Sequence, residues 1–149
     1  MIEIRVATML DLEVLVAFQQ KLAFESEGVT LDVEKVTLGM KRLLADASKG
    51  VYYVVQDGGQ PIACHLITYE WSDWRNGMVW WLQSVYVSQD YRSKGIFRLM
   101  YDNIIRMINA DPELIGLRLY VDKSNTKAMK VYEAMGMNGE HYTVFEWMK

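Results

Sequence analysis

The sequence predicts a mixed α/β fold, with helices on both faces of one central sheet. Two observations lead to this prediction. Short segments rich in β-branched and aromatic residues are typical of strands, and longer segments with apolar residues every three or four positions are typical of helices. The two kinds of segment follow one another in the order βααβββαβαβ. No repeat or linker interrupts this order, so we expect a single domain over residues 1–149.

The first three elements are a strand and two helices. Residues Ile2–Val6 alternate apolar and charged side chains, as a half-buried strand does. Thr8 is a suitable N-cap for a helix that ends at Gly28, and Thr30 is a suitable N-cap for the next one. Gly39 lies inside this second helix and is expected to bend or split it, because glycine disfavours helix interiors.

Three strands are expected next. Residues 51–56 and 61–69 flank Asp57-Gly58-Gly59-Gln60, which is a strong signal for a tight hairpin turn. A polar connection over residues 70–77 leads to the third strand, residues 78–87. This third strand is the expected centre of the fold because the most informative turn of the sequence follows it.

The rest of the chain alternates helices and strands. The helix that begins at Gly95 carries Ile96, Met100 and Ile104 on one apolar face. Gly116 precedes an expected strand over residues 117–121. A helix over residues 125–135 with Gly136 as C-cap and a closing strand over residues 142–147 complete the predicted order.

The turn between residue 87 and the helix at Gly95 favours an anionic ligand. The first turn of a helix has backbone N–H groups without intrahelical partners, and the helix dipole adds positive charge there. Arg92 and Lys94 contribute two cations, and Gly95 allows close approach of the backbone to a ligand. A surface turn that merely keeps the protein soluble is the alternative, because a single glycine is weak evidence.

A second segment of the sequence favours an anion-binding turn over a turn that only keeps the protein soluble. The turn Arg92-Ser93-Lys94-Gly95-Ile96-Phe97 resembles the Gln/Arg-x-x-Gly-x-Gly/Ala phosphate turn of the GNAT N-acetyltransferase superfamily. The last expected helix resembles that family's Asn-x-x-Ala-x-x-x-Tyr-x-x-x-Gly pattern, at Asn125, Ala128, Tyr132 and Gly136. Phe97 departs from the family's small residue, and we expect its side chain to point into the core.

The resemblance implies that the chain binds acetyl-CoA. It implies a GNAT-like sheet whose strands 80–87 and 117–121 are parallel and splay apart around the cofactor. The implied cofactor-binding residues are Val85, Tyr86, Val87, Arg92, Ser93, Lys94, Gly95, Ile96, Phe97, Asn125, Ala128 and Tyr132. Asn125 has a second reading, as the N-cap of its own helix.

Acetyl transfer to an amine needs an acid for the thiolate and a base for the amine. By resemblance Tyr132 is the acid, and packing in a helix stripe is its alternative role. Relatives place a glutamate base where this chain has Gln83 or Trp81. The amine therefore loses its proton to a water held by Gln83, or to Glu70 or Glu146. His141 could also serve by its pKa, and His65 is expected to be a hydrogen-bonded core residue.

Aromatic residues indicate the acceptor. Trp71, Trp74, Trp81 and Tyr142, with Glu70 and Asp73 nearby in sequence, suit a small cationic amine. The expected function is thus N-acetylation of a primary amine by direct attack in a ternary complex. A non-catalytic acyl-CoA-binding module is the alternative, because both family glutamates are absent. A nucleotide-binding domain is disfavoured because the turn lacks the usual glycine motifs.

Composition sets further limits. The net charge of −3 argues against a nucleic-acid partner, and no apolar run is long enough to span a membrane. The N-terminal residues lack the features of a signal peptide, and the single Cys64, expected to be an inert core thiol, suits a reducing compartment. We therefore expect a cytoplasmic protein without a metal site. The family makes a homodimer a reasonable expectation.

Overall fold

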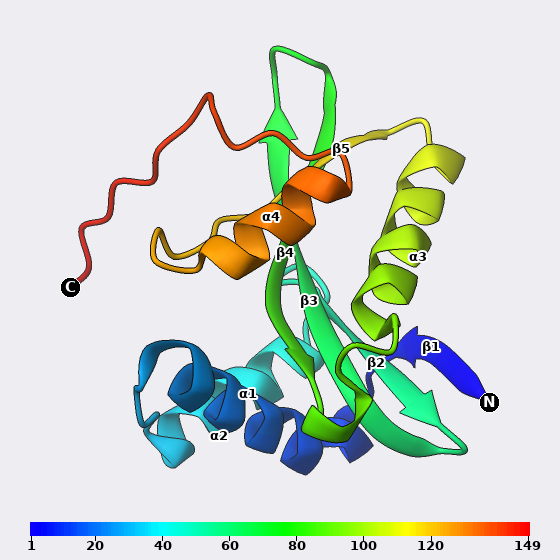
Figure 1. Cartoon of the computed structure of the whole chain (residues 1–149), viewed down its shortest axis with the longest axis vertical. Helices are drawn as coiled ribbons and strands as arrows, with labels where there is room; N and C mark the ends of the chain where they lie inside the picture. The colour runs from blue at the N-terminus through cyan, green and yellow to red at the C-terminus, as the bar shows by residue number, and fades with distance from the viewer. The chain divides into compact units, whose positions relative to one another are not determined.

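Five strands form one sheet in the order β1-β2-β3-β4-β5 in a computed structural model that describes residues 1–149 (Figure 1). The strands are β1 (Ile2–Val6), β2 (Val51–Asp57), β3 (Gln60–Ser72), β4 (Gly77–Val87) and β5 (Leu114–Arg118). The helices are α1 (Leu12–Glu27), α2 (Val33–Leu44), α3 (Ile96–Ala110) and α4 (Thr126–Ala134), with 3-10 turns η1 (Met9–Asp11) and η2 (Gln89–Tyr91). Strands β1 to β4 pair antiparallel, and β5 pairs parallel with β4.

The contacts divide the chain into two compact units, residues 1–118 and residues 119–149. The first unit holds the whole sheet with α1, α2 and α3, and the second holds α4 and the C-terminal segment. The mixed α/β class predicted from the sequence is confirmed, whereas the single domain over residues 1–149 stays a prediction.

Apolar side chains cover both faces of the sheet. Val54 and Val55 are neighbours in β2 and point to opposite faces, because side chains alternate along a strand. The Val54 face packs against α1 and α2, through residues such as Leu15, Phe18 and Met40. The Val55 face packs against α3, through Ile96 and Met100 (Figure 1). The prediction of helices on both faces is therefore confirmed within the first unit.

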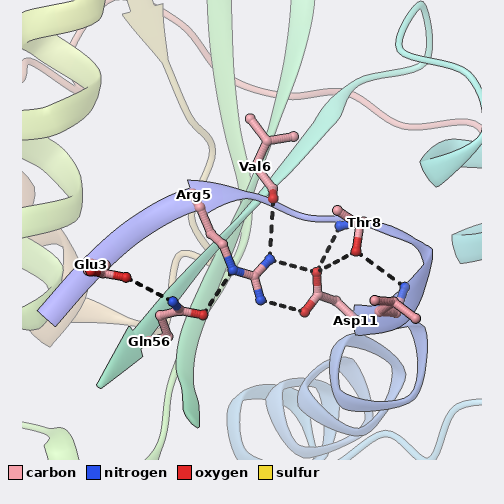
Figure 2. A network of polar contacts seen from close by, with 7 residues as sticks. Glu3, Arg5, Val6, Thr8, Asp11 and Gln56 are labelled. Carbon is pink, nitrogen blue, oxygen red and sulfur yellow. Dashed lines mark hydrogen bonds and ion pairs between the residues drawn. The ribbon is translucent and has the colours of Figure 1, made fainter. Parts of the chain in front are cut away.

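A polar network joins β1 to the start of α1 (Figure 2). Both guanidinium Nη atoms of Arg5 donate to the carboxylate of Asp11 at 2.8 Å. The Thr8 N–H donates to the same carboxylate, and the Thr8 side chain accepts from the Leu10 N–H, as its predicted role as a cap requires. The bond from Arg5 lowers the pKa of Asp11, so this buried carboxylate stays charged.

Helix α2 differs from the sequence prediction in two ways. Its N-cap is Asp32, whose carboxylate accepts from the Lys35 N–H at 3.1 Å, and not Thr30. Since the helix begins at Val33, Thr30 lies too far from the unpaired N–H groups of the first turn. The helix also runs through Gly39 without a break, because contacts along its apolar face offset the poor helix propensity of one glycine.

Two strands have other bounds than predicted. β3 extends to Ser72 because residues 68–72 pair with residues 77–81 of β4, which reduces the expected polar connection to residues 73–76. β5 spans Leu114–Arg118 instead of residues 117–121. Its register with β4 decides this, since Gly116 pairs with Val79 and so lies inside the strand rather than before it.

The second unit contains one helix and no strand. The Asn125 side chain caps α4 by accepting from the Ala128 N–H at 3.2 Å, and Gly136 follows the helix with φ of 91°. The closing strand predicted over residues 142–147 is wrong, because this segment has no regular secondary structure. A β-like pattern predicts a preference for extended backbone, but it does not supply the neighbouring strand that a ladder needs.

Candidate active site

Strand β4 changes its neighbours along its length. β5 pairs only with residues 78–81 of β4, while β3 stays paired with β4 as far as Val87. An irregularity in the β3–β4 register lies opposite Ser84, whose φ is 54°. No strand of the sheet therefore pairs with the β5-facing edge of β4 over residues 82–87. The predicted cofactor residues Val85, Tyr86 and Val87 lie on this stretch.

The turn after β4 is shaped for an anion. Ser93 and Gly95 both have positive φ, of 60° and 79°, and no side chain caps the first turn of α3. Consecutive N–H groups in such a turn converge, and the helix dipole adds to their positive potential. A Cβ built on Gly95 would meet no atom within 4 Å, so the space beside the turn is open. The ammonium of Lys94 lies 5.4 Å from the ring centre of Tyr91.

Arg92 binds to the protein itself. Its Nε donates to the Val87 carbonyl oxygen and its Nη2 to the Glu25 carboxylate, both at 2.9 Å, and its guanidinium lies 5.5 Å from the Tyr86 ring centre. The bond to Glu25 raises the pKa of Arg92. Arg92 thus ties the turn to the last part of α1. The sequence did not reveal this contact, because Glu25 and Arg92 are 67 residues apart and no local pattern joins them.

Phe97 does not enter the core, contrary to the prediction. Ile96, the preceding residue, is the one that packs beneath α3 with 6% of its surface exposed. Phe97 is only partly buried, and its ring faces Tyr101 at a centroid distance of 6.5 Å. The helical spacing explains this, because the buried face of α3 follows Ile96, Met100 and Ile104 and leaves Phe97 to one side.

Glu70 belongs to a cluster that spans three strands. Its Oε1 accepts from the indole Nε1 of Trp81 at 2.8 Å, and both its carboxylate oxygens lie 2.9 Å from Nη1 of Arg118. The bond from Trp81, followed by that from Arg118, lowers the pKa of Glu70. These bonds oppose proton uptake, which is what a general base requires. The sequence did not reveal this contact of Arg118, because Glu70 and Arg118 are 48 residues apart and no local pattern joins them.

Three further side chains of β3 and β4 were considered from the sequence, namely those of Gln83, Cys64 and His65. The Gln83 side-chain amide donates to the Thr68 hydroxyl oxygen at 2.6 Å, which fixes its orientation. Cys64 is fully buried, as predicted, and burial raises the pKa of its thiol to about 12. His65 is also fully buried, but both of its ring nitrogens lack hydrogen-bond partners. The prediction of a hydrogen-bonded core histidine is therefore wrong in that respect.

The aromatic residues expected at the acceptor site do not gather in one place within the first unit. Trp81 shares a face of the sheet with Glu70, whereas Trp71 follows Glu70 in β3 and points to the other face. Trp74 lies in the turn between β3 and β4 and is 89% exposed. A cavity of about 240 Å³ instead lies among α1, α2 and the sheet, lined by Gln19, Leu31, Val36, Gly39, Met40, Leu43, Tyr52 and Leu66.

The second unit contains the remaining predicted residues. Asn125, Ala128 and Tyr132 lie at and along α4, with Ala128 and Tyr132 one turn apart on the same side of the helix. Asn125 acts as the N-cap, its alternative role. Burial raises the pKa of the Tyr132 phenol, which keeps it protonated. Tyr142 and Glu146 lie in the C-terminal segment without regular structure.

A mixed sheet whose fourth strand leads through an uncapped turn into a helix defines an α/β protein with a candidate anion-binding turn. The family model described as "Acetyltransferase (GNAT) family" matches residues 17–137. The chain therefore belongs to the GNAT acetyltransferase family and is an acetyltransferase. No curated protein matches the sequence.

Solved structures agree with this assignment. A possible acetyltransferase from Clostridium difficile 630 is 43% identical, with a TM-score of 0.94 over 99% of this chain and 97% of that one. A predicted acetyltransferase from Clostridium acetobutylicum, solved with acetyl-CoA, is 19% identical, with a TM-score of 0.76 over 98% and 96%. A ribosomal-protein-alanine N-acetyltransferase from Brucella melitensis is 13% identical, with a TM-score of 0.80 over the full length of both. The last two likenesses concern the fold alone.

Proposed function

We propose that this chain transfers the acetyl group of acetyl-CoA to a primary amine, by direct attack in a ternary complex. The uncapped first turn of α3, with left-handed Ser93 and Gly95, is the observation that carries the proposal. The Clostridium acetobutylicum protein of the same fold was solved with acetyl-CoA. Family membership supports the reaction type.

The residues present fit this cofactor. The turn offers convergent N–H groups, a nearby cation on Lys94, and open space beside Gly95 for a pyrophosphate. The edge of β4 at residues 85–87 offers backbone groups for an extended pantetheine arm. When bound, acetyl-CoA supplies a thioester carbonyl that an amine can attack. Asn125 and Ala128 are the proposed contacts on α4.

Two side chains are the proposed proton carriers. The Tyr132 phenol holds a proton that it can give to a thiolate, because burial raises its pKa and so keeps it protonated. Gln83, oriented by Thr68, can hold a water that takes the proton of the amine. Glu70 is a weaker candidate for the base because of its ion pair with Arg118, which leaves Glu146 as the second carboxylate. A backbone N–H near Val85 or Tyr86 would polarise the carbonyl.

A small cationic amine is the proposed acceptor. Trp71 and Trp74 expose aromatic surface on either side of Asp73, and aromatic faces with a carboxylate attract cations. Trp81 and Tyr142 complete the proposed acceptor residues.

The phosphate turn is tested by calorimetric titration with CoA. Replacing Arg92 and Lys94 by alanine together should weaken binding about tenfold or more. Lys94 would lose a charge-assisted phosphate contact worth roughly 1.5–3 kcal/mol, and Arg92 would no longer tie the turn to Glu25. The matched control replaces Lys41 and Arg42, which removes the same charge from the last turn of α2. An unchanged affinity in the first variant would refute the proposed turn.

The reaction is tested by release of free CoA with a panel of amines. Tyr132→Phe should lower kcat on the order of a hundredfold with little change in CoA affinity, as loss of a general acid does. The control is Tyr69→Phe, since the Tyr69 hydroxyl only donates to the Ala47 carbonyl oxygen. Binding of CoA without turnover of any amine would instead favour the non-catalytic module.

We also propose a homodimer in the cytoplasm. Phe145, Trp147 and Met148 are each more than four-fifths exposed, and large exposed apolar side chains often mark an interface. The free thiol of Cys64 is compatible with a reducing compartment. None of the helices combines the length and apolar character needed to cross a membrane. Sedimentation equilibrium tests the dimer, which Phe145→Glu with Trp147→Glu should dissociate.

A further inference from the structure

We propose that Glu70 is a positioning residue that fixes where the pairing of β4 with β5 ends. The inference rests on the proposed function, because the free edge of β4 beyond that point is where we place the pantetheine arm. It assigns Glu70 a role other than general base.

The hydrogen bonds of Glu70 meet at the last rung of the parallel ladder. Trp81 of β4 and Arg118 of β5 are the final pair of that ladder. The Glu70 carboxylate accepts from both of them, at 2.8 Å from Trp81 Nε1 and 2.9 Å from Arg118 Nη1. One side chain of β3 therefore binds both members of the pair at which the two strands part.

We call the contacts of Glu70 with Trp81 and Arg118 the clamp. Such side-chain contacts matter here because the backbone pairing of β4 with β5 is short. β5 is a five-residue edge strand, and its parallel pairing with β4 comprises only four residue pairs with an irregularity after the first. Short edge strands open easily at their ends. The carboxylate is half-exposed and the guanidinium less so, which leaves the ion pair only partly screened by water.

The charge of Glu70 suits a clamp and not a proton acceptor. Its hydrogen bonds with Trp81 and Arg118, and the nearby charge of Arg75, all favour the carboxylate over the carboxylic acid. Without this carboxylate, the end of β5 should open more often. The free edge of β4 would then lose its fixed starting point, and CoA binding should weaken.

The test compares Glu70→Ala with Glu70→Gln, and with Glu113→Ala as the control. Glu113 immediately precedes β5, but its side chain makes no hydrogen bond. In the free protein, Glu70→Ala should speed hydrogen exchange of the paired β5 amides about tenfold, while exchange in the core of β2 stays unchanged. The CoA dissociation constant should rise about fivefold or more. Glu70→Gln keeps an acceptor for Trp81 but lacks the charge for Arg118, so its effects should be intermediate.

The outcomes separate the clamp from its alternatives. If both variants abolish kcat at saturating CoA and amine, with unchanged exchange and CoA affinity, Glu70 is the base and the inference fails. If exchange at β5 stays unchanged in Glu70→Ala, the inference also fails. Exchange is measured without ligand, so a failure of the proposed acetyl transfer would leave that result intact. A pH profile of kcat whose acidic limb is the same in Glu70→Gln and the wild type would further support the clamp.

Discussion

His65 is the residue whose surroundings conflict most with its chemistry. It has no exposed surface, and its ring stacks on Tyr53 at 5.1 Å with an interplanar angle of 10°. Neither ring nitrogen has a hydrogen-bond partner. Burial lowers the pKa of His65 to about 4. The imidazole is therefore neutral at neutral pH, and its protonation must weaken the fold.

We predict that stability falls as the pH is lowered from about 6.5 to 4. The unfolded chain binds a proton near pH 6.5 and the folded chain only near 4, so the contribution of His65 is complete above 6.5 and lost progressively below it. The loss by pH 5 should be about 2 kcal/mol. Denaturant unfolding at pH 7, 6 and 5 measures it.

The variant His65→Leu should flatten this dependence, because leucine fills a similar volume and carries no titrating group. His141→Leu is the control, since His141 is exposed in the C-terminal segment. The explanation would be wrong if His65→Leu lost as much stability between pH 7 and pH 5 as the wild-type protein.

At the scale of elements, two glycines show how context decides the effect of a side chain. Gly39 lies in α2, and Gly77 begins β4. Neither has a positive φ. A Cβ at Gly39 would meet no atom within 4 Å, whereas a Cβ at Gly77 would lie 2.5 Å from Cγ2 of Ile115 in β5.

We predict opposite effects of alanine at these two positions. Gly39→Ala should raise the free energy of unfolding by roughly 1 kcal/mol, because alanine loses less backbone entropy than glycine in a helix. Gly77→Ala should lower it, because the Ile115 side chain must shift to make room. Denaturant midpoints of the two variants test this. Destabilisation by Gly39→Ala would indicate that α2 needs the glycine for another reason.

The sequence predicted elements well where local signals were strong, and poorly where a distant partner decides. The Thr8 cap, the Gly58-Gly59 hairpin and the α3 face all follow from residues a few positions apart, and the structure has them. The bounds of β5 depend on its register with β4, and residues 142–147 lack the partner that a strand needs. For the site, the turn could be predicted, but the contacts of Arg92 with Glu25 and of Glu70 with Arg118 join residues 67 and 48 positions apart.

At the scale of the whole molecule, the two units raise the question of cooperativity. Residues 119–149 form a small unit, and α4 has no fully buried residue. A unit of this size buries too little surface to be stable alone. We therefore expect one unfolding transition for residues 1–149, which calorimetry can test by comparing the calorimetric and van't Hoff enthalpies. Two separate transitions would contradict the single domain predicted from the sequence.

CoA should stabilise the protein against heat. A ligand that binds only the folded state at 100 times its dissociation constant adds about 2.7 kcal/mol. For a chain of this length that corresponds to a rise in Tm of roughly 5–11 °C. Differential scanning calorimetry with CoA measures the shift, and adenosine, which lacks the phosphates, is the control. An equal shift with adenosine would mean that the α3 turn contributes little.

The buried thiol of Cys64 has a practical consequence for such measurements. It is the only sulfhydryl of the chain, and its pKa of about 12 leaves almost no reactive thiolate at neutral pH. Chromogenic thiol reagents should therefore measure the CoA that the reaction releases without a background signal from the folded enzyme. Without substrate, the rate at which the same reagents label Cys64 would report how often the sheet beneath α1 opens, because the buried thiol can react only in the opened state.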